Sequence, residues 1–272
     1  MKTIEIDLKE VESLGSRKAV AFGVVSLIND EKSENKDIAR VANSDPNLSA
    51  NILRMANSAY YGLSGRVDDL QFAISVIGFG TVRFLATAAV IQDFVPISRE
   101  SWKRYLATAG AAIQLAPHFG VDTSAALNGG ITLDIGELVI AKQDPYGYIS
   151  RMRELEKVPQ ADRALAAVEM EIKAYGISHP EILARVLKAW KFPQDLYEAV
   201  EQHHLEYEPG DPLARVLRYA AWFSDRILNG DELSGPEDIS IAGVSDYRKI
   251  VSGAQNFMDQ MSHQSVAGRF GR

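Results

Sequence analysis

The stretch DPNLSANILRMANSAYYG, residues 45–62, decides the fold because its apolar residues recur at the spacing of an α-helix. Asp45 can accept hydrogen bonds from the first free backbone N–H groups, and Pro46 follows at a position where a missing N–H is tolerated. The apolar stripe consists of Leu48, Ile52, Leu53, Met55, Ala56 and Ala59. The pattern predicts a helix over residues 46–59.

The remainder of the chain has the same helical character. Ala, Leu, Glu, Lys, Arg and Gln dominate, and no pair of alternating stretches indicates a β-hairpin. The segment 68–90 is typical of two helices that meet at Gly78. The predicted helices span residues 7–14, 16–30, 34–43, 46–59, 68–77, 79–92, 99–119, 122–141, 144–156, 160–174, 179–191, 193–205 and 211–229.

Composition narrows the class of protein. The chain has 272 residues, of which 46% are hydrophobic and 24% charged, as in ordinary folded proteins. It has no cysteine, which excludes disulfides, zinc–thiolate sites and thiol nucleophiles. The net charge of −7 argues against nucleic acid as a partner. No signal peptide is visible, and the apolar run over residues 84–95 is too short to span a bilayer, so we expect a cytoplasmic protein without membrane insertion.

The stretch 45–62 resembles the DP-x-L-x-x-x-I-L-R-x-x-N-S-x-x-Y-G segment of HDOD domains, which are bacterial signalling relatives of the HD phosphohydrolases. Residues 178–204 carry a second similar stretch, and the resemblance extends over roughly residues 10–230. It departs at LGSRKAVAF, residues 14–22, which lacks the Leu-Pro pairs common in the family.

The resemblance implies an all-α, two-lobed protein. We expect an N-terminal helical bundle over residues 1–95, an HD-like helical lobe over 96–230 and a partly ordered extension over 231–272. The boundary is placed at the proline-containing segment DFVPIS, residues 93–98. From Ser252 the sequence is polar and small, which predicts a loose tail in which Phe257, Met258 and Met261 can dock one short helix.

The family's relatives use several His and Asp side chains to hold divalent ions, which lower the pKa of a bound water that attacks phosphorus. By resemblance, Arg104 stands where the first histidine is expected, and a guanidinium cannot coordinate a cation. Leu133 replaces the histidine of the His-Asp pair, and Trp222 replaces the closing aspartate, with Asp225 the nearest carboxylate. The positions that match this ligand set, the relic HD-site positions, are Arg104, Leu133, Asp134, His179, His203, His204 and Trp222.

Because the set is incomplete, we expect no catalytic residue, no metal and no cofactor. If a metal does bind, the expected ligands are Asp134, His179 and His203, since three ligands can hold one ion.

Two of these histidines have structural interpretations as well. His203 lies on the apolar face of its helix, where it can be a core histidine hydrogen-bonded to a buried carboxylate such as Asp134. His179 follows Ser178, a plausible N-cap that forms a capping box with Glu181, and it can be part of that helix start.

Asp134 lies in an apolar run and needs a partner if it is buried. Arg104 can supply one, so we predict a direct contact between the two side chains where a metal once lay. Asn57 and Ser58 either brace the turn that ends the helix over 46–59 or form, with Arg104, a patch for a ligand or partner.

The resemblance therefore implies a non-catalytic bacterial signalling or regulatory module that acts through contacts with other signalling proteins. A small phosphorylated ligand in the degenerate HD site is a further expected partner. The alternatives are a residual metal-dependent phosphohydrolase that acts on a nucleotide or cyclic dinucleotide, and a nucleotide sensor that binds without cleavage through Arg104.

Overall fold

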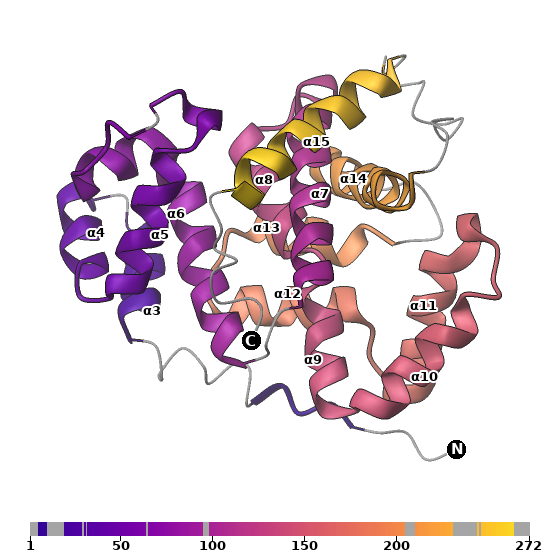
Figure 1. Ribbon diagram of the computed structural model, residues 1–272. Helices are drawn as coiled ribbons and strands as arrows, with labels where there is room; N and C mark the ends of the chain where they lie inside the picture. Colours follow the sequence, from indigo (N-terminus) through magenta and orange to yellow (C-terminus); the bar gives the residue numbers. More distant parts are fainter. Residues whose placement is uncertain are drawn as a thin grey trace.

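The computed structural model describes residues 5–9, 19–28, 30, 32–63, 65–94, 98–204, 210–230, 244 and 246–263. Over these residues the protein is helical and contains no strand, as the sequence predicts (Figure 1). The helices are α3 (Ala19–Ile28), α4 (Asn35–Ala42), α5 (Pro46–Ala56), α6 (Leu70–Phe94), α7 (Arg99–Leu115), α8 (Thr123–Thr132), α9 (Ile135–Gln143), α10 (Pro145–Leu155), α11 (Gln160–Tyr175), α12 (His179–Ala189), α13 (Gln194–Gln202), α14 (Pro212–Asn229) and α15 (Tyr247–His263), with the short 3₁₀ helices η1 (Ala59–Tyr61) and η2 (Ala116–Phe119). The predicted helix over 7–14 lies mostly outside the described residues.

Helices α3, α4 and α5 pack against α6 and form the N-terminal group of helices. The α5 start is as predicted, since the Asp45 carboxylate accepts hydrogen bonds from the backbone N–H groups of Asn47 and Leu48. The Asn57 amide at the end of α5 donates to the Leu53 and Val67 carbonyls and accepts from the Val67 N–H. Asn57 therefore braces the turn that follows α5.

Helix α6 joins the N-terminal group to the rest of the molecule and is broken at Gly78, where the predicted meeting point of two helices is confirmed. Gly78 has φ 75° and ψ 161°, a conformation that a residue with a Cβ rarely adopts. By length and composition, the stretch Leu70–Ala89 is apolar enough to cross a membrane, and it is longer than the run over residues 84–95 considered from the sequence. Its burial against α3, α4, α5 and α8 is typical of the core helix of a folded protein.

The larger group of helices is built around α7, which contacts α8, α14 and α15. The prediction of one helix over residues 122–141 is wrong, because the chain breaks at Leu133 and Asp134 between α8 and α9. The expected docked helix with Phe257 and Met261 is present as α15, but it starts at Tyr247 and runs to His263 along α7, so residues 252–263 are not a loose tail. Residues 264–272 lie outside the described residues.

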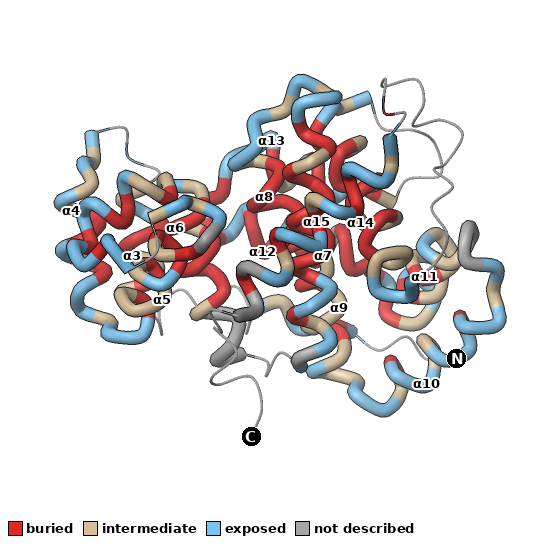
Figure 2. Tube along the Cα trace, turned by 45° about the horizontal axis from the view of Figure 1, so that its top comes forward, coloured by how far each residue is buried: buried red, intermediate tan, exposed pale blue. Residues whose placement is uncertain are grey.

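One continuous cluster of buried apolar side chains runs through both groups of helices, from Ile6 in the N-terminal segment to Met261 in α15. Buried residues, red in Figure 2, accordingly lie in both groups. Phe22 of α3 packs its ring edge-on against Trp190 at the end of α12, with ring centroids 5.6 Å apart. The division at residues 95 and 96 stays a prediction.

Candidate functional site

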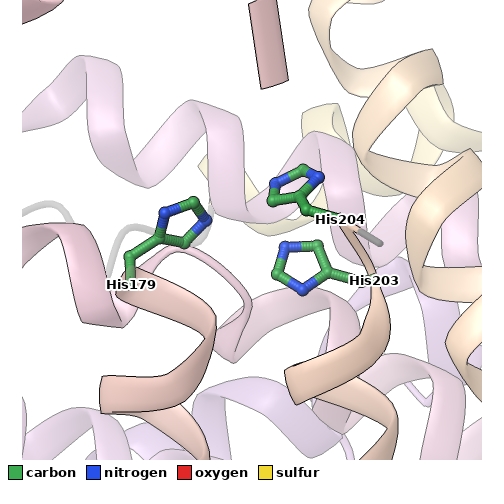
Figure 3. A group of neighbouring side chains, drawn as sticks. All are labelled: His179, His203 and His204. Carbon is green, nitrogen blue, oxygen red and sulfur yellow. The ribbon is translucent and has the colours of Figure 1, made fainter. Parts of the chain in front are cut away.

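Three imidazoles meet where α12 begins and α13 ends (Figure 3). His179 is the first residue of α12, His203 is the C-cap of α13, and His204 follows it. One ring nitrogen of each histidine lies within 4.8 Å of the corresponding atoms of the other two. His179 is 1% exposed and His203 is fully buried. The sequence predicted these three positions, and the structure brings them together as an imidazole cluster.

Glu171 of α11 orients His179. Its Oε2 accepts hydrogen bonds from Nδ1 and from the backbone N–H of His179, both at 2.8 Å, and its Oε1 accepts one from the Tyr148 hydroxyl at 3.0 Å. A carboxylate is an acceptor, so the His179 proton is on Nδ1 and Nε2 faces the other two histidines. The His179 Nε2 is buried and has no hydrogen-bond partner among the described residues.

His203 is held by its own helix. Its Nδ1 donates to the Val200 carbonyl, and its buried Nε2 also lacks a partner within the described part of the chain. The predicted hydrogen bond from His203 to Asp134 is therefore absent, because the Nδ1 proton is taken by a backbone carbonyl three residues earlier. The Nε2 atoms of His179 and His203 are thus two buried ring nitrogens without a hydrogen-bond partner among the described residues.

Beside the imidazoles lies a group of carboxylates: Asp134, Glu137 and Asp225. Arg104 of α7 makes an ion pair with Asp225 of α14, while Asp134 and Glu137 act on its charge through space. No hydrogen bond or ion pair within the described part of the chain joins Arg104 to Asp134, so the predicted direct contact is corrected. The tight packing of α7 against α14 places Asp225, rather than Asp134, within reach of the guanidinium.

The two halves of the site are held together by a close approach of α9 to α12. A Cβ added to Gly136 would lie 2.1 Å from the His179 carbonyl oxygen. Backbone atoms cannot move aside as side-chain ends do, so only glycine at position 136 lets the turn that carries Asp134 and Glu137 meet the start of α12.

Burial and neighbouring charges set the protonation of the site. Burial alone would lower the pKa of His179, but Glu171, Glu137 and Asp134 outweigh it and raise that pKa to about 9. Burial, followed by the charge of His179, lowers the pKa of His203 to about 3, and burial also lowers the pKa of His204. Burial raises the pKa of Asp134, and burial together with Asp134 raises that of Glu137 to about 7.

The remaining predicted residues lie at the edge of the site or outside it. Leu133 is fully buried in the apolar core. Trp222 packs against Phe223 and beneath the Arg226 guanidinium, so Asp225 is the residue of α14 that reaches the carboxylates. Ser178 is the N-cap of α12, but its side chain makes no capping hydrogen bond, so the capping box with Glu181 is not formed.

The geometry does not support the suggested ligand or partner patch of Asn57, Ser58 and Arg104. The Asn57 amide is used by the backbone, and Ser58 is fully buried with an Oγ that has no partner among the described residues. Arg104 lies beside Asp134 and Glu137 and makes an ion pair with Asp225.

Two important residues, Glu171 and Glu137, escaped the sequence analysis. Glu171 lies outside the matched motifs, in an amphipathic helix. A glutamate on such a helix is normally solvated, but Glu171 is 0% exposed to solvent. Glu137 lies three residues after Asp134, and that spacing on one helical turn was the available signal.

The residues fit one divalent transition-metal ion on the imidazole side. Neutral imidazole nitrogens suit such ions, so His179 would have to release the proton that its raised pKa retains. A carboxylate that binds the far nitrogen of a ligand histidine, as Glu171 binds Nδ1 of His179, is a common support. Arg104 supplies a permanent positive charge on the carboxylate side, where a second ion would otherwise balance Asp134 and Glu137.

The helical fold and its buried histidine–carboxylate site define a domain of the HD-like helical class. The HDOD domain family model matches residues 14–206, and the chain belongs to that family.

Solved structures and one curated relative are similar to this chain. A candidate phosphohydrolase from Shewanella amazonensis SB2B is 25% identical, with a TM-score of 0.68 over 90% of this chain and 93% of that one. A candidate signal transduction protein from Marinobacter aquaeolei VT8 is 22% identical, with a TM-score of 0.69 over 93% of this chain and 59% of that one. An uncharacterized protein from Treponema pallidum (strain Nichols) is 24% identical over 204 residues, and the match spans 72% of this chain and 39% of that relative.

Proposed function

We propose that this chain is a non-catalytic regulatory module that acts through contacts with other proteins in signal transduction. The observation that carries the proposal is the Arg104–Asp225 ion pair beside Asp134 and Glu137. A permanent cation of the protein pairs with Asp225 and offsets part of the charge of Asp134 and Glu137, the carboxylates that a catalytic metal would need, and it cannot itself activate water. The signal-transduction description of the Marinobacter relative agrees with this proposal.

Burial supports the same conclusion. His179 and His203 are at most 1% exposed, so a phosphodiester cannot reach a nucleophile generated between them without an opening of α12 and α13. A phosphorylated ligand at Arg104 would also meet the three carboxylates around it, which makes a phosphate sensor at this position unfavourable.

The test is hydrolysis of bis(p-nitrophenyl) phosphate and of a cyclic dinucleotide in the presence of Mn²⁺, Fe²⁺ or Ni²⁺. We expect the wild-type chain to show no turnover beyond that of His179→Ala. His118→Ala, which removes an exposed histidine, is the matched control. The proposal would be contradicted if the wild type and His118→Ala hydrolysed either substrate and His179→Ala did not.

A second candidate is a metal-dependent phosphohydrolase, favoured by the two buried Nε2 atoms without partners and by the phosphohydrolase description of the Shewanella relative. His179, His203 and His204 would hold the ion, which when bound would lower the pKa of a water ligand. Elemental analysis of protein purified without a metal-affinity column tests the binding step. Near-stoichiometric metal that is lost in His203→Ala and kept in His118→Ala supports this candidate, whereas less than about a tenth of an equivalent opposes it.

A further inference from the structure

Helix α15 lies across α7 and reaches from the larger group of helices to the N-terminal group (Figure 1). One face of α15 is buried and carries apolar side chains, while the opposite face is polar and exposed. The buried residues are Ile250, Val251, Ala254, Phe257 and Met261. The exposed residues include Arg248, Lys249, Ser252, Gln255, Asn256 and Asp259.

The first half of α15 is seated at backbone contact distance on α7. Ile250, Val251 and Ala254 belong to a buried cluster with side chains of α7 and α14. A Cβ added to Gly110 of α7 would lie 3.0 Å from the Cα and carbonyl oxygen of Ala254. Glycine at position 110 therefore permits this approach of the two backbones, and Ala254 is fully buried at the crossing point, where a larger side chain would overpack the contact.

The second half of α15 fills a cleft between the two groups of helices. Phe257 and Met261 line this cleft together with Met55, Phe84 and Trp102. The Phe257 ring packs edge-on against Tyr60 of η1, with centroids 5.6 Å apart. The empty cavity that remains is about 20 Å³, room for roughly one water molecule, so α15 fills the cleft almost completely.

We propose that this cleft and the α7 seat form a helix-binding groove, that α15 occupies it in cis, and that a partner protein is recognised by an amphipathic helix that competes with α15. The proposal rests on the proposed function, since it names the kind of contact through which a regulatory module acts. The groove dictates the partner's pattern, with apolar residues at the spacing of Ile250, Ala254, Phe257 and Met261, a small second residue and a large third one.

The apolar lining of the cleft supports an exchangeable occupant. Without α15, Met55, Phe84 and Trp102 would present a contiguous apolar surface to water, and such surfaces are typical of interaction sites.

A fluorescein-labelled peptide of residues 246–263, added to the full chain, tests the proposal. Phe257→Ala/Met261→Ala in the chain weakens the cis occupant, so we expect the labelled peptide to bind this variant at least about tenfold more tightly than wild type. Gln255→Ala/Asn256→Ala alters the exposed face and should bind as wild type does. A peptide with Ala254→Leu should bind none of the three, because Ala254 is fully buried against α7 and a larger side chain would overpack the contact.

Amide hydrogen exchange of the wild-type chain gives a second measurement that needs no core substitution. With unlabelled peptide in excess, amides of α15 should lose protection while those of α7 keep it. Three results would contradict the proposed groove. They are equal affinity of the peptide for wild type and Phe257→Ala/Met261→Ala, tight binding of the Ala254→Leu peptide, and peptide binding without loss of α15 protection. None of these results depends on phosphohydrolase activity, which the hydrolysis assay tests separately.

Discussion

At the scale of single residues, Glu171 makes three hydrogen bonds, two to His179 and one to Tyr148. In Glu171→Gln the negative charge is lost, and we expect unfolding at pH 7 to become easier by about 2 kcal/mol, within the range for a broken buried charge interaction. Urea denaturation followed by circular dichroism measures the change. Glu169→Gln, on the exposed face of the same helix, should change the stability by less than about 0.5 kcal/mol.

The same interaction predicts how stability depends on pH. The pKa of His179 is about 9 in the folded protein, against 6.5 for an ordinary histidine, so its contribution is fully present below pH 6.5 and is lost as the pH rises through 9. We expect a loss of up to about 3 kcal/mol over this interval from His179. Denaturation midpoints at pH 6, 7, 8 and 9 measure it. A slope in Glu171→Gln as steep as that of the wild type would mean that another group carries the effect.

The positive charge of Arg104 affects Asp134 and Glu137 as well as its ion-pair partner Asp225. Arg104→Met leaves Asp134, Glu137 and Asp225 without the cation beside them. Because the Arg104 and Asp225 side chains are 46% and 42% exposed and solvent screens their charges, we expect a loss of stability of about 1 kcal/mol or less at pH 8. The loss should be smaller at pH 5, because the raised pKa values of Asp134 and Glu137 let these carboxyls become neutral. Lys103→Met, one residue earlier and exposed, is the control for both pH values. Equal losses at pH 5 and pH 8 would contradict the electrostatic explanation.

At the scale of elements, helix positions followed from the sequence where start signals and apolar spacing agree. Asp45-Pro46 and the kink at Gly78 are such cases. The break between α8 and α9 was missed because the residues on both sides are apolar and continue a helical pattern, so only tertiary packing ends the first helix. The three histidines were identified by resemblance to a family motif, whereas Glu171 was missed because its burial depends on α10 and α12, which no local pattern reveals.

The approach of α9 to α12 yields a prediction at this scale. Gly136→Ala places a methyl group against the His179 carbonyl, so we expect a loss of stability of about 1–3 kcal/mol or more, typical of an overpacked contact. Gly210→Ala is the control, since a Cβ there meets no atom within 4 Å and the glycine has an ordinary φ. Thermal unfolding of the two variants measures the difference. If Gly136→Ala were as stable as Gly210→Ala, the two helices would not be in backbone contact.

At the scale of the whole molecule, the continuous apolar cluster raises the question of whether the two groups of helices unfold together. The chain has three tryptophans, Trp102, Trp190 and Trp222. Trp102 and Trp190 contact Phe84 and Phe22, so the probe is the fluorescence of Trp222 in a Trp102→Phe/Trp190→Phe background, which reports on the larger group of helices. Circular dichroism reports on every helix. The two probes therefore separate the alternatives.

Ile52 of α5 is fully buried in the N-terminal group, and Ile52→Ala should cost about 2–5 kcal/mol. Because Phe22 packs on Trp190, and Phe84 stacks on Trp102 with centroids 6.3 Å apart, we expect the loss to reach both groups of helices. The tryptophan and circular dichroism transitions of Ile52→Ala should then coincide and shift together to lower urea concentration. A tryptophan transition that stays at the wild-type midpoint, with an earlier circular dichroism phase, would instead mean that residues 1–95 and 96–230 unfold as separate domains.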